Sequence, residues 1–119
     1  MRDLSQMSGP WVGFWIQRRL RGNMGLALSF GNGRITGTGS DLIGAFRLDG
    51  DYSDDGAVRF VKTYAWHHVD YKGKWDDQMI SGTWKIKYEG SGAFEIWPES
   101  EMHGFEQVFE TETRPLQNT

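Results

Sequence analysis

Apolar and polar residues alternate along most of this chain, in short runs separated by glycine-bearing turns. In residues 79–88 (MISGTWKIKY), Ile80 and Trp84 fall on one side of the alternation, whereas Lys85 and Lys87 fall on the other. Successive side chains of a strand point in opposite directions, so a period of two places one set on a buried face and the other in water. The chain is therefore predicted to consist of β-strands.

The turns between these runs are rich in glycine, asparagine and aspartate, the residues that tolerate turn conformations. They include LRGN at 20–23, SDDG at 53–56 and EGSG at 89–92. The strands are expected at 11–18, 24–30, 34–40, 45–52, 57–64, 67–75, 79–88 and 93–97. Strands joined by short loops pair with their sequence neighbours, and closure of the sheet removes its exposed edges.

We therefore predict an all-β fold, an antiparallel eight-stranded up-and-down β-barrel with a C-terminal tail. A length of 119 residues fits one domain. Residues 1–98 are expected to form the single barrel domain, with 1–10 as a flexible lead-in. Residues 99–119 contain five glutamates and are expected to form an acidic tail or a short extra element.

Charge and composition exclude several classes of function. The net charge is −3 and the basic residues are scattered, which argues against nucleic-acid binding. The absence of cysteine excludes disulfides and suits a reducing cytosol, so a cytoplasmic location is expected. No signal peptide is recognisable, and no apolar run approaches the roughly 18 residues of a membrane helix. We expect a soluble protein with no membrane partner.

Three segments resemble the calycin group of barrels, and its avidin–streptavidin branch in particular. Gly9–Gln17 (GPWVGFWIQ) is similar to the Gly-x-Trp that opens the first strand of that group. Gly33–Gly39 (GRITGTG) resembles the branch's second hairpin, and Gly82–Ile86 (GTWKI) resembles a late strand with a central Trp. The resemblance implies a barrel with a ligand site inside it.

The position of the polar ligand contact differs from that of the biotin binders. Two residues after the first Trp comes Gly13, or Gln17 if Trp15 is the equivalent residue. The resemblance thus implies the barrel rather than biotin as the ligand. The stretch Gly37–Gly73 is also similar to small uncharacterised bacterial proteins, for which no activity follows from the pattern.

Lys62 is the most unusual candidate, because it shares the parity of Phe60 and Tyr64. An inward-facing lysine would need a carboxylate partner, an anionic ligand or a lowered pKa, since burial of an unpaired ammonium is costly. Alternatively, Lys62 lies near a barrel mouth and extends its head outward. Asp41, after a glycine-rich strand, is expected to cap a turn.

His67 is the second polar candidate, as an inward hydrogen-bonding group or general base. Alternatively, it is a hairpin-end histidine that bonds to backbone, and in both cases His68 should face solvent. Adjacent strand residues face opposite sides, so the pair does not form a metal site, and no metal or cofactor is predicted. Tyrosines add polar groups to an apolar wall; Tyr52, Tyr64, Tyr71 and Tyr88 fall on apolar parities. The proposed ligand-binding residues are Trp15, Gln17, Lys62, Tyr64, His67, Tyr71 and Trp84.

Three functions remain open from these residues. The first is non-enzymatic binding of a small, partly aromatic or anionic ligand inside the barrel. The second is a structural or interaction module with a filled barrel, which self-associates as a homodimer or higher homo-oligomer through the first strand and Trp97. The third is an enzyme with His67 and a tyrosine as acid and base, which lacks support because no triad pattern is present.

Overall fold

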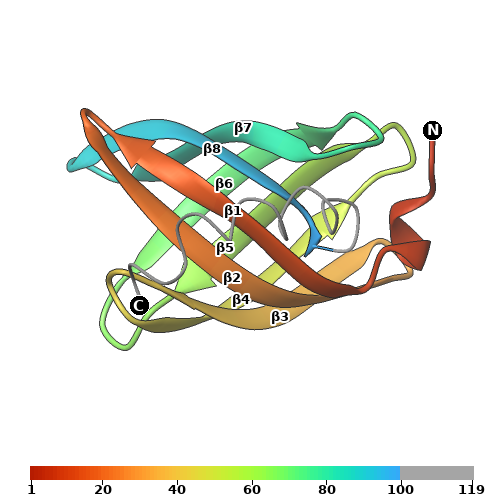
Figure 1. Ribbon diagram of the computed structural model, residues 1–119, viewed down its shortest axis with the longest axis horizontal. Coiled ribbons are helices and arrows are strands. Elements are labelled where there is room, and N and C mark those ends of the chain that lie inside the picture. The colour runs from red at the N-terminus through yellow and green to blue at the C-terminus, as the bar shows by residue number, and fades with distance from the viewer. Residues whose placement is uncertain (100–119) are drawn as a thin grey trace, which may run out of the picture.

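The computed structural model describes residues 1–99 and is a closed barrel of eight antiparallel strands in chain order (Figure 1). β1 pairs with both β2 and β8, which closes the sheet. The predicted up-and-down barrel is confirmed. Its elements are η1 (Leu4–Gln6), β1 (Gly9–Gln17), β2 (Leu20–Gly31), β3 (Arg34–Asp41), β4 (Ala45–Tyr52), β5 (Ala57–Thr63), β6 (His68–Trp75), β7 (Ile80–Ile86) and β8 (Gly90–Pro98).

Two predicted turns are wrong and lie mainly within strands. Residues 20–23 belong to β2, and residues 90–92 belong to β8. Gly22 lies opposite Trp15, and a Cβ there would be 2.1 Å from the indole ring. Gly92 lies opposite Trp84, and its Cβ would be 2.7 Å from Nε1. These glycines make room for two indole rings on the sheet rather than bending the chain.

The barrel interior is filled by the side chains that point inward from each strand. Along β1, which is apolar on both sides, Trp11 and Trp15 point inward and are buried, whereas Val12, Phe14 and Ile16 point outward and are half-buried. In the middle, Tyr71 stacks on Phe60 with ring centroids 4.8 Å apart, and Phe94 packs edge-on against both rings.

One end of the barrel, which we call the closed end, is covered by the N-terminal segment. Leu4 in η1 is 3% exposed and belongs to the core. The indole nitrogen of Trp11 donates to the Met7 carbonyl, and that of Trp75 donates to the Arg2 carbonyl, both at 2.8 Å. The expected flexible lead-in is therefore corrected, because its apolar residues pack against the barrel and its carbonyls accept hydrogen bonds from core indoles.

The opposite end, which we call the open end, carries the turns between β1 and β2, β3 and β4, β5 and β6, and β7 and β8. In Figure 1 these four turns lie at the left, and the N-terminus lies at the right. The expected C-terminal tail, residues 99–119, lies outside the described residues except for Glu99. Within residues 1–99, no helix has the length and apolar character needed to cross a membrane.

Candidate ligand-binding pocket

A pocket of about 90 Å³ enters the barrel at the open end. The structure brings all seven proposed ligand-binding residues to its wall, although they come from four different strands and one turn. Three further residues, Ile43, Val69 and Ile86, complete the lining. The seven are Trp15, Gln17, Lys62, Tyr64, His67, Tyr71 and Trp84.

Lys62 forms the floor of this site and faces inward, as its parity predicts. Its Nζ lies 2.9 Å from Asp41 Oδ2, and the two side chains are 1% and 0% exposed. The ring centroids of Phe46, Tyr64 and Tyr71 lie 4.8, 5.1 and 5.0 Å from Nζ. Of the predicted ways to bury a lysine, the molecule uses a carboxylate partner, aided by aromatic faces that attract a cation.

Asp41 is a site residue whose main role, as the carboxylate partner of Lys62, was not predicted from the sequence. Its Oδ1 accepts hydrogen bonds from the backbone N–H groups of Ile43 at 2.9 Å and Gly44 at 3.3 Å, the expected cap of a turn. Its Oδ2 points into the barrel and accepts from Lys62, from the Tyr64 hydroxyl at 2.5 Å and from Trp15 Nε1 at 3.2 Å. This carboxylate is therefore fully hydrogen-bonded.

The pKa values of the network follow from burial and from this pairing. Burial alone would raise the pKa of Asp41, but hydrogen bonds from Tyr64 and Lys62 and the Lys62 charge outweigh it and hold the pKa below its ordinary value. Burial lowers the pKa of Lys62, and Asp41 opposes that shift. Burial, with the Asp41 charge, raises the pKa of Tyr64 and Tyr71, which keeps both hydroxyls protonated as donors.

Two indoles and two polar side chains shape the rest of the pocket. Trp15 and Trp84 are buried, and Trp84 Nε1 donates to the Ile16 carbonyl at 2.9 Å. His67 lies in the turn before β6 and stacks on Tyr64, with centroids 4.8 Å apart. Gln17 is exposed at the end of β1. The aromatic walls are thus held in place, the imidazole is half-buried against Tyr64, and Gln17 lies in solvent.

Other polar candidates lie outside the pocket. Tyr52 packs edge-on against Phe30, whose neighbour is Trp11 of the closed end. Tyr88, expected on an apolar face, is 94% exposed because it occupies a turn with φ of 67°, and this prediction is wrong. His68 is exposed. No group of three potential metal-ligating side chains occurs within residues 1–99.

The outer face of β1 and β8 carries a half-buried aromatic pair. The rings of Phe14 and Trp97 meet edge-on with centroids 6.1 Å apart, and the Arg21 guanidinium lies 3.9 Å from the Phe14 centroid. Trp97 Nε1 is buried and has no hydrogen-bond partner in the described part of the chain. This face is the surface on which the sequence predicts self-association.

Comparison with known proteins does not assign the chain to a group. No family model matches the sequence, and no curated protein matches it significantly. The eight-stranded antiparallel barrel is consistent with a calycin-like fold.

Proposed function

We propose that this protein binds one small, partly aromatic molecule in the pocket at the open end, without converting it chemically. The observation that supports this most is the convergence of aromatic walls and a buried ion pair on one accessible cavity, while the other end is covered. Ligand sites combine apolar walls with a few polar groups in this way. The resemblance to avidin-like barrels supports the same location for the ligand.

The volume of the pocket indicates the size of the ligand. A cavity of about 90 Å³ holds about six to nine water-sized groups, if each needs roughly 10–15 Å³ of the same kind of volume. That space matches a single aromatic ring with one small substituent. A larger ligand would extend through the mouth, between Gln17 and His67.

The charges favour an uncharged ligand over the anion that sequence reasoning allowed. The Lys62 ammonium is already neutralised by Asp41, so a buried carboxylate on the ligand would lack a counterion of its own. Two donors remain. Lys62 has three N–H groups, of which one bonds to Asp41 and one lies near Met24 Sδ at 3.8 Å. The Tyr71 hydroxyl has no hydrogen-bond partner among residues 1–99. A carbonyl oxygen satisfies such donors.

Three one-ring probes test this function: benzamide, benzoate and toluene. They share a phenyl ring with one substituent but offer a neutral acceptor, a charged acceptor and no acceptor. Binding is followed by the NMR signals of the indole N–H groups. We expect benzamide to shift the signals of Trp15 and Trp84 but not those of Trp11 and Trp75, and to bind more tightly than the other two.

A matched pair of variants sharpens the assignment. Tyr71→Phe removes one pocket hydroxyl and should weaken benzamide binding by about 0.5–1.5 kcal/mol while leaving toluene unchanged. Tyr52→Phe removes a hydroxyl near the closed end and should change neither. If none of the three probes shifts the Trp15 and Trp84 signals, the pocket is not such a site. Tighter binding of benzoate would reject the uncharged ligand alone.

A second candidate function, self-association through the outer face of β1 and β8, is favoured by Phe14 and by Trp97, whose buried Nε1 has no hydrogen-bond partner among residues 1–99. Aromatic residues are enriched at such interfaces. Sedimentation of the same NMR samples tests it, and a monomer at those concentrations would exclude it.

A further inference from the structure

The exposed apolar side chains of this protein gather at one end of the barrel. Within residues 1–99, every large apolar or aromatic side chain that is exposed lies in or beside an open-end turn, except for Met1. Trp66 is 87% and Tyr88 is 94% exposed. The remaining members are Leu20, Leu42 and Ile43, at 50%, 65% and 56%. We call these five residues the rim.

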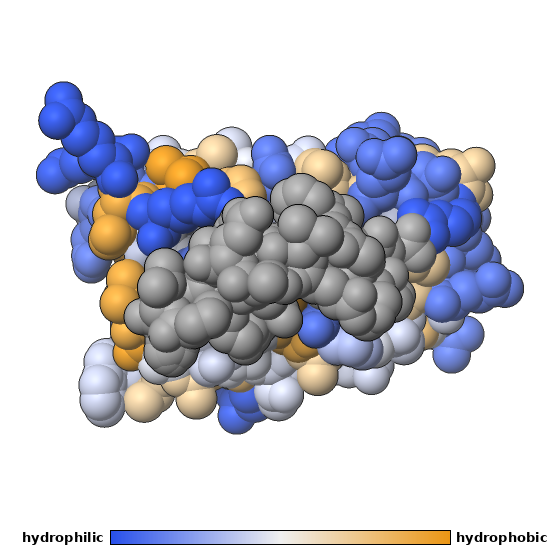
Figure 2. All heavy atoms as spheres, viewed as in Figure 1, coloured by the Kyte–Doolittle hydropathy of each residue, from blue (hydrophilic) through white to orange (hydrophobic). Residues whose placement is uncertain are grey.

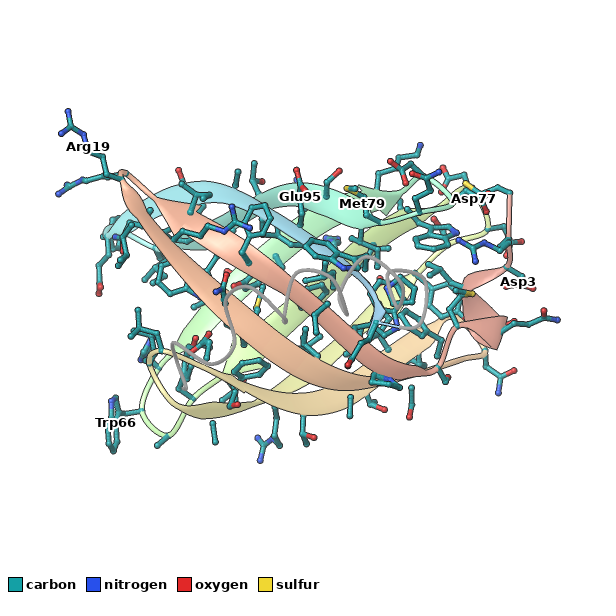
Figure 3. The ribbon with its side chains drawn as sticks, viewed as in Figure 1. Asp3, Arg19, Trp66, Asp77, Met79 and Glu95 are labelled. Carbon is teal, nitrogen blue, oxygen red and sulfur yellow. The ribbon has the colours of Figure 1, made fainter. Side chains whose placement is uncertain are left out.

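The two ends also carry opposite charge. The open-end turns contain Arg18, Arg19 and Lys87, against a single Glu89. The closed-end turns are acidic, with Asp54, Asp55, Asp76 and Asp77. Figure 3 shows Arg19 and Trp66 projecting from the left end of the molecule, and Asp3 and Asp77 at the right. The protein is therefore polarised, although its net charge is only −3.

Figure 2 shows apolar surface at the same left end of the molecule, beside strongly hydrophilic groups. The rim residues come from four separate turns, so they form a ring of apolar tips rather than one flat patch. Tyr88 has the Lys87 ammonium 5.2 Å from its ring centroid. The exposed apolar side chains and the basic side chains thus occur together at this end, which makes it the candidate interaction surface.

We propose that the open end docks on the surface of an anionic lipid bilayer, with the rim inserted at headgroup level and the three basic residues against the lipid phosphates. Tryptophan and tyrosine prefer this interface because their rings are apolar and their polar groups stay wet. Each Lys or Arg near an anionic surface adds about five-fold in affinity. Such docking needs no segment that spans the bilayer, so it revises the expectation of no membrane partner.

A bilayer fits these observations better than a folded protein partner. Protein interfaces concentrate their aromatic residues in a continuous, well-packed centre. Here the apolar groups are spread over separate turns at the open end, and each is exposed to solvent. Ile43 belongs to both the rim and the pocket lining, so docking would place the pocket mouth against the lipid. The proposal does not depend on any ligand for the pocket.

Flotation of the full chain with vesicles tests the proposal. We expect binding to vesicles of equal parts phosphatidylcholine and phosphatidylserine, little binding to phosphatidylcholine alone, and a loss of binding as salt is raised. A blue shift of tryptophan fluorescence should accompany binding and be absent in Trp66→Ser. Trp66 is exposed, so this variant should fold.

Charge variants provide the matched control. Arg19→Glu with Lys87→Glu should reduce binding to the mixed vesicles at least about ten-fold. Arg59→Glu with Lys72→Glu changes the net charge by the same amount, at exposed positions that pair between β5 and β6. This second double variant should reduce vesicle binding far less. Failure of the wild-type chain to bind the mixed vesicles, or equal losses in the two double variants, would overturn the proposal.

Discussion

The two ends of the barrel use the same side chain for different purposes. At the closed end, Trp11 and Trp75 are 0% and 2% exposed, and their indole nitrogens donate to carbonyls of the N-terminal segment. At the open end, Trp15 donates to the buried carboxylate of Asp41, and no chain segment from residues 1–99 covers the rings. The indoles of Trp11 and Trp75 hold the N-terminal segment against the barrel, whereas those of Trp15 and Trp84 line the pocket.

The two ends also differ in the charges that they bury and in the apolar side chains that they expose. The closed end is apolar inside, has acidic turns outside and is covered by the N-terminal segment. The open end places an ion pair in the interior and apolar side chains in solvent, both of which are unfavourable for an isolated domain. Departures of this kind are concentrated where proteins bind something.

Removal of Lys62 should produce the largest effect. Lys62→Ala leaves the Asp41 carboxylate buried without its counterion, so we expect the free energy of unfolding to fall by about 3–5 kcal/mol. Urea denaturation at neutral pH measures it. Arg34→Ala breaks the exposed Arg34–Asp49 pair and should cost less than about 1 kcal/mol. Equal losses in the two variants would show that the buried pair contributes no more than a surface pair.

Truncation of Leu4 tests the closed end. Leu4→Ala should lower the free energy of unfolding by about 2–5 kcal/mol, because it leaves a cavity under η1. Leu20→Ala, at a half-exposed open-end position, should change it by about 0.5 kcal/mol or less. The Trp15 and Trp84 indole signals should be unchanged in Leu4→Ala. If they moved, the two ends would not be independent.

The smallest effect is expected in the acid dependence of stability. The folded-state pKa of Asp41 lies below its ordinary value of 3.8, so the unfolded chain binds the proton first. The stabilisation by Asp41 is therefore present above about pH 4 and is lost as the pH falls through the lower, folded-state value. Unfolding followed from neutral pH to strong acid measures this slope.

Asp77 provides the closed-end comparison, because hydrogen bonds from Arg2 also lower its pKa while its side chain is 46% exposed. Salt screens exposed charges but reaches buried ones poorly. Asp41→Asn should therefore flatten the acid slope at low and high salt, whereas Asp77→Asn should flatten it only at low salt. Identical salt dependence in the two variants would contradict burial as the difference.

Sequence patterns predicted the barrel and the inward direction of Tyr71 and Trp84, because alternation reports the face of a strand directly. They left Lys62 open between an inward position and a barrel mouth, and they did not separate the two apolar faces of the first strand at Trp15. They failed at Gly22 and Gly92, which were interpreted as parts of turns. A glycine required by a cross-strand indole and a glycine required by a bend look alike in one sequence. The signal that could have separated them is the register, which places Trp15 and Trp84 opposite them.

The sequence alone therefore determined the strand order, and it required a partner for Lys62 if that side chain faced inward. It left open whether the interior is filled or hollow. Tertiary structure decided that this partner is Asp41, 21 residues away, because barrel closure turns the end of β3 toward β5 across the open end. It also decided which end is sealed and where the exposed apolar tips gather. Alternation specifies the direction of each side chain within its own strand, but only the closed sheet sets the distances between side chains on different strands.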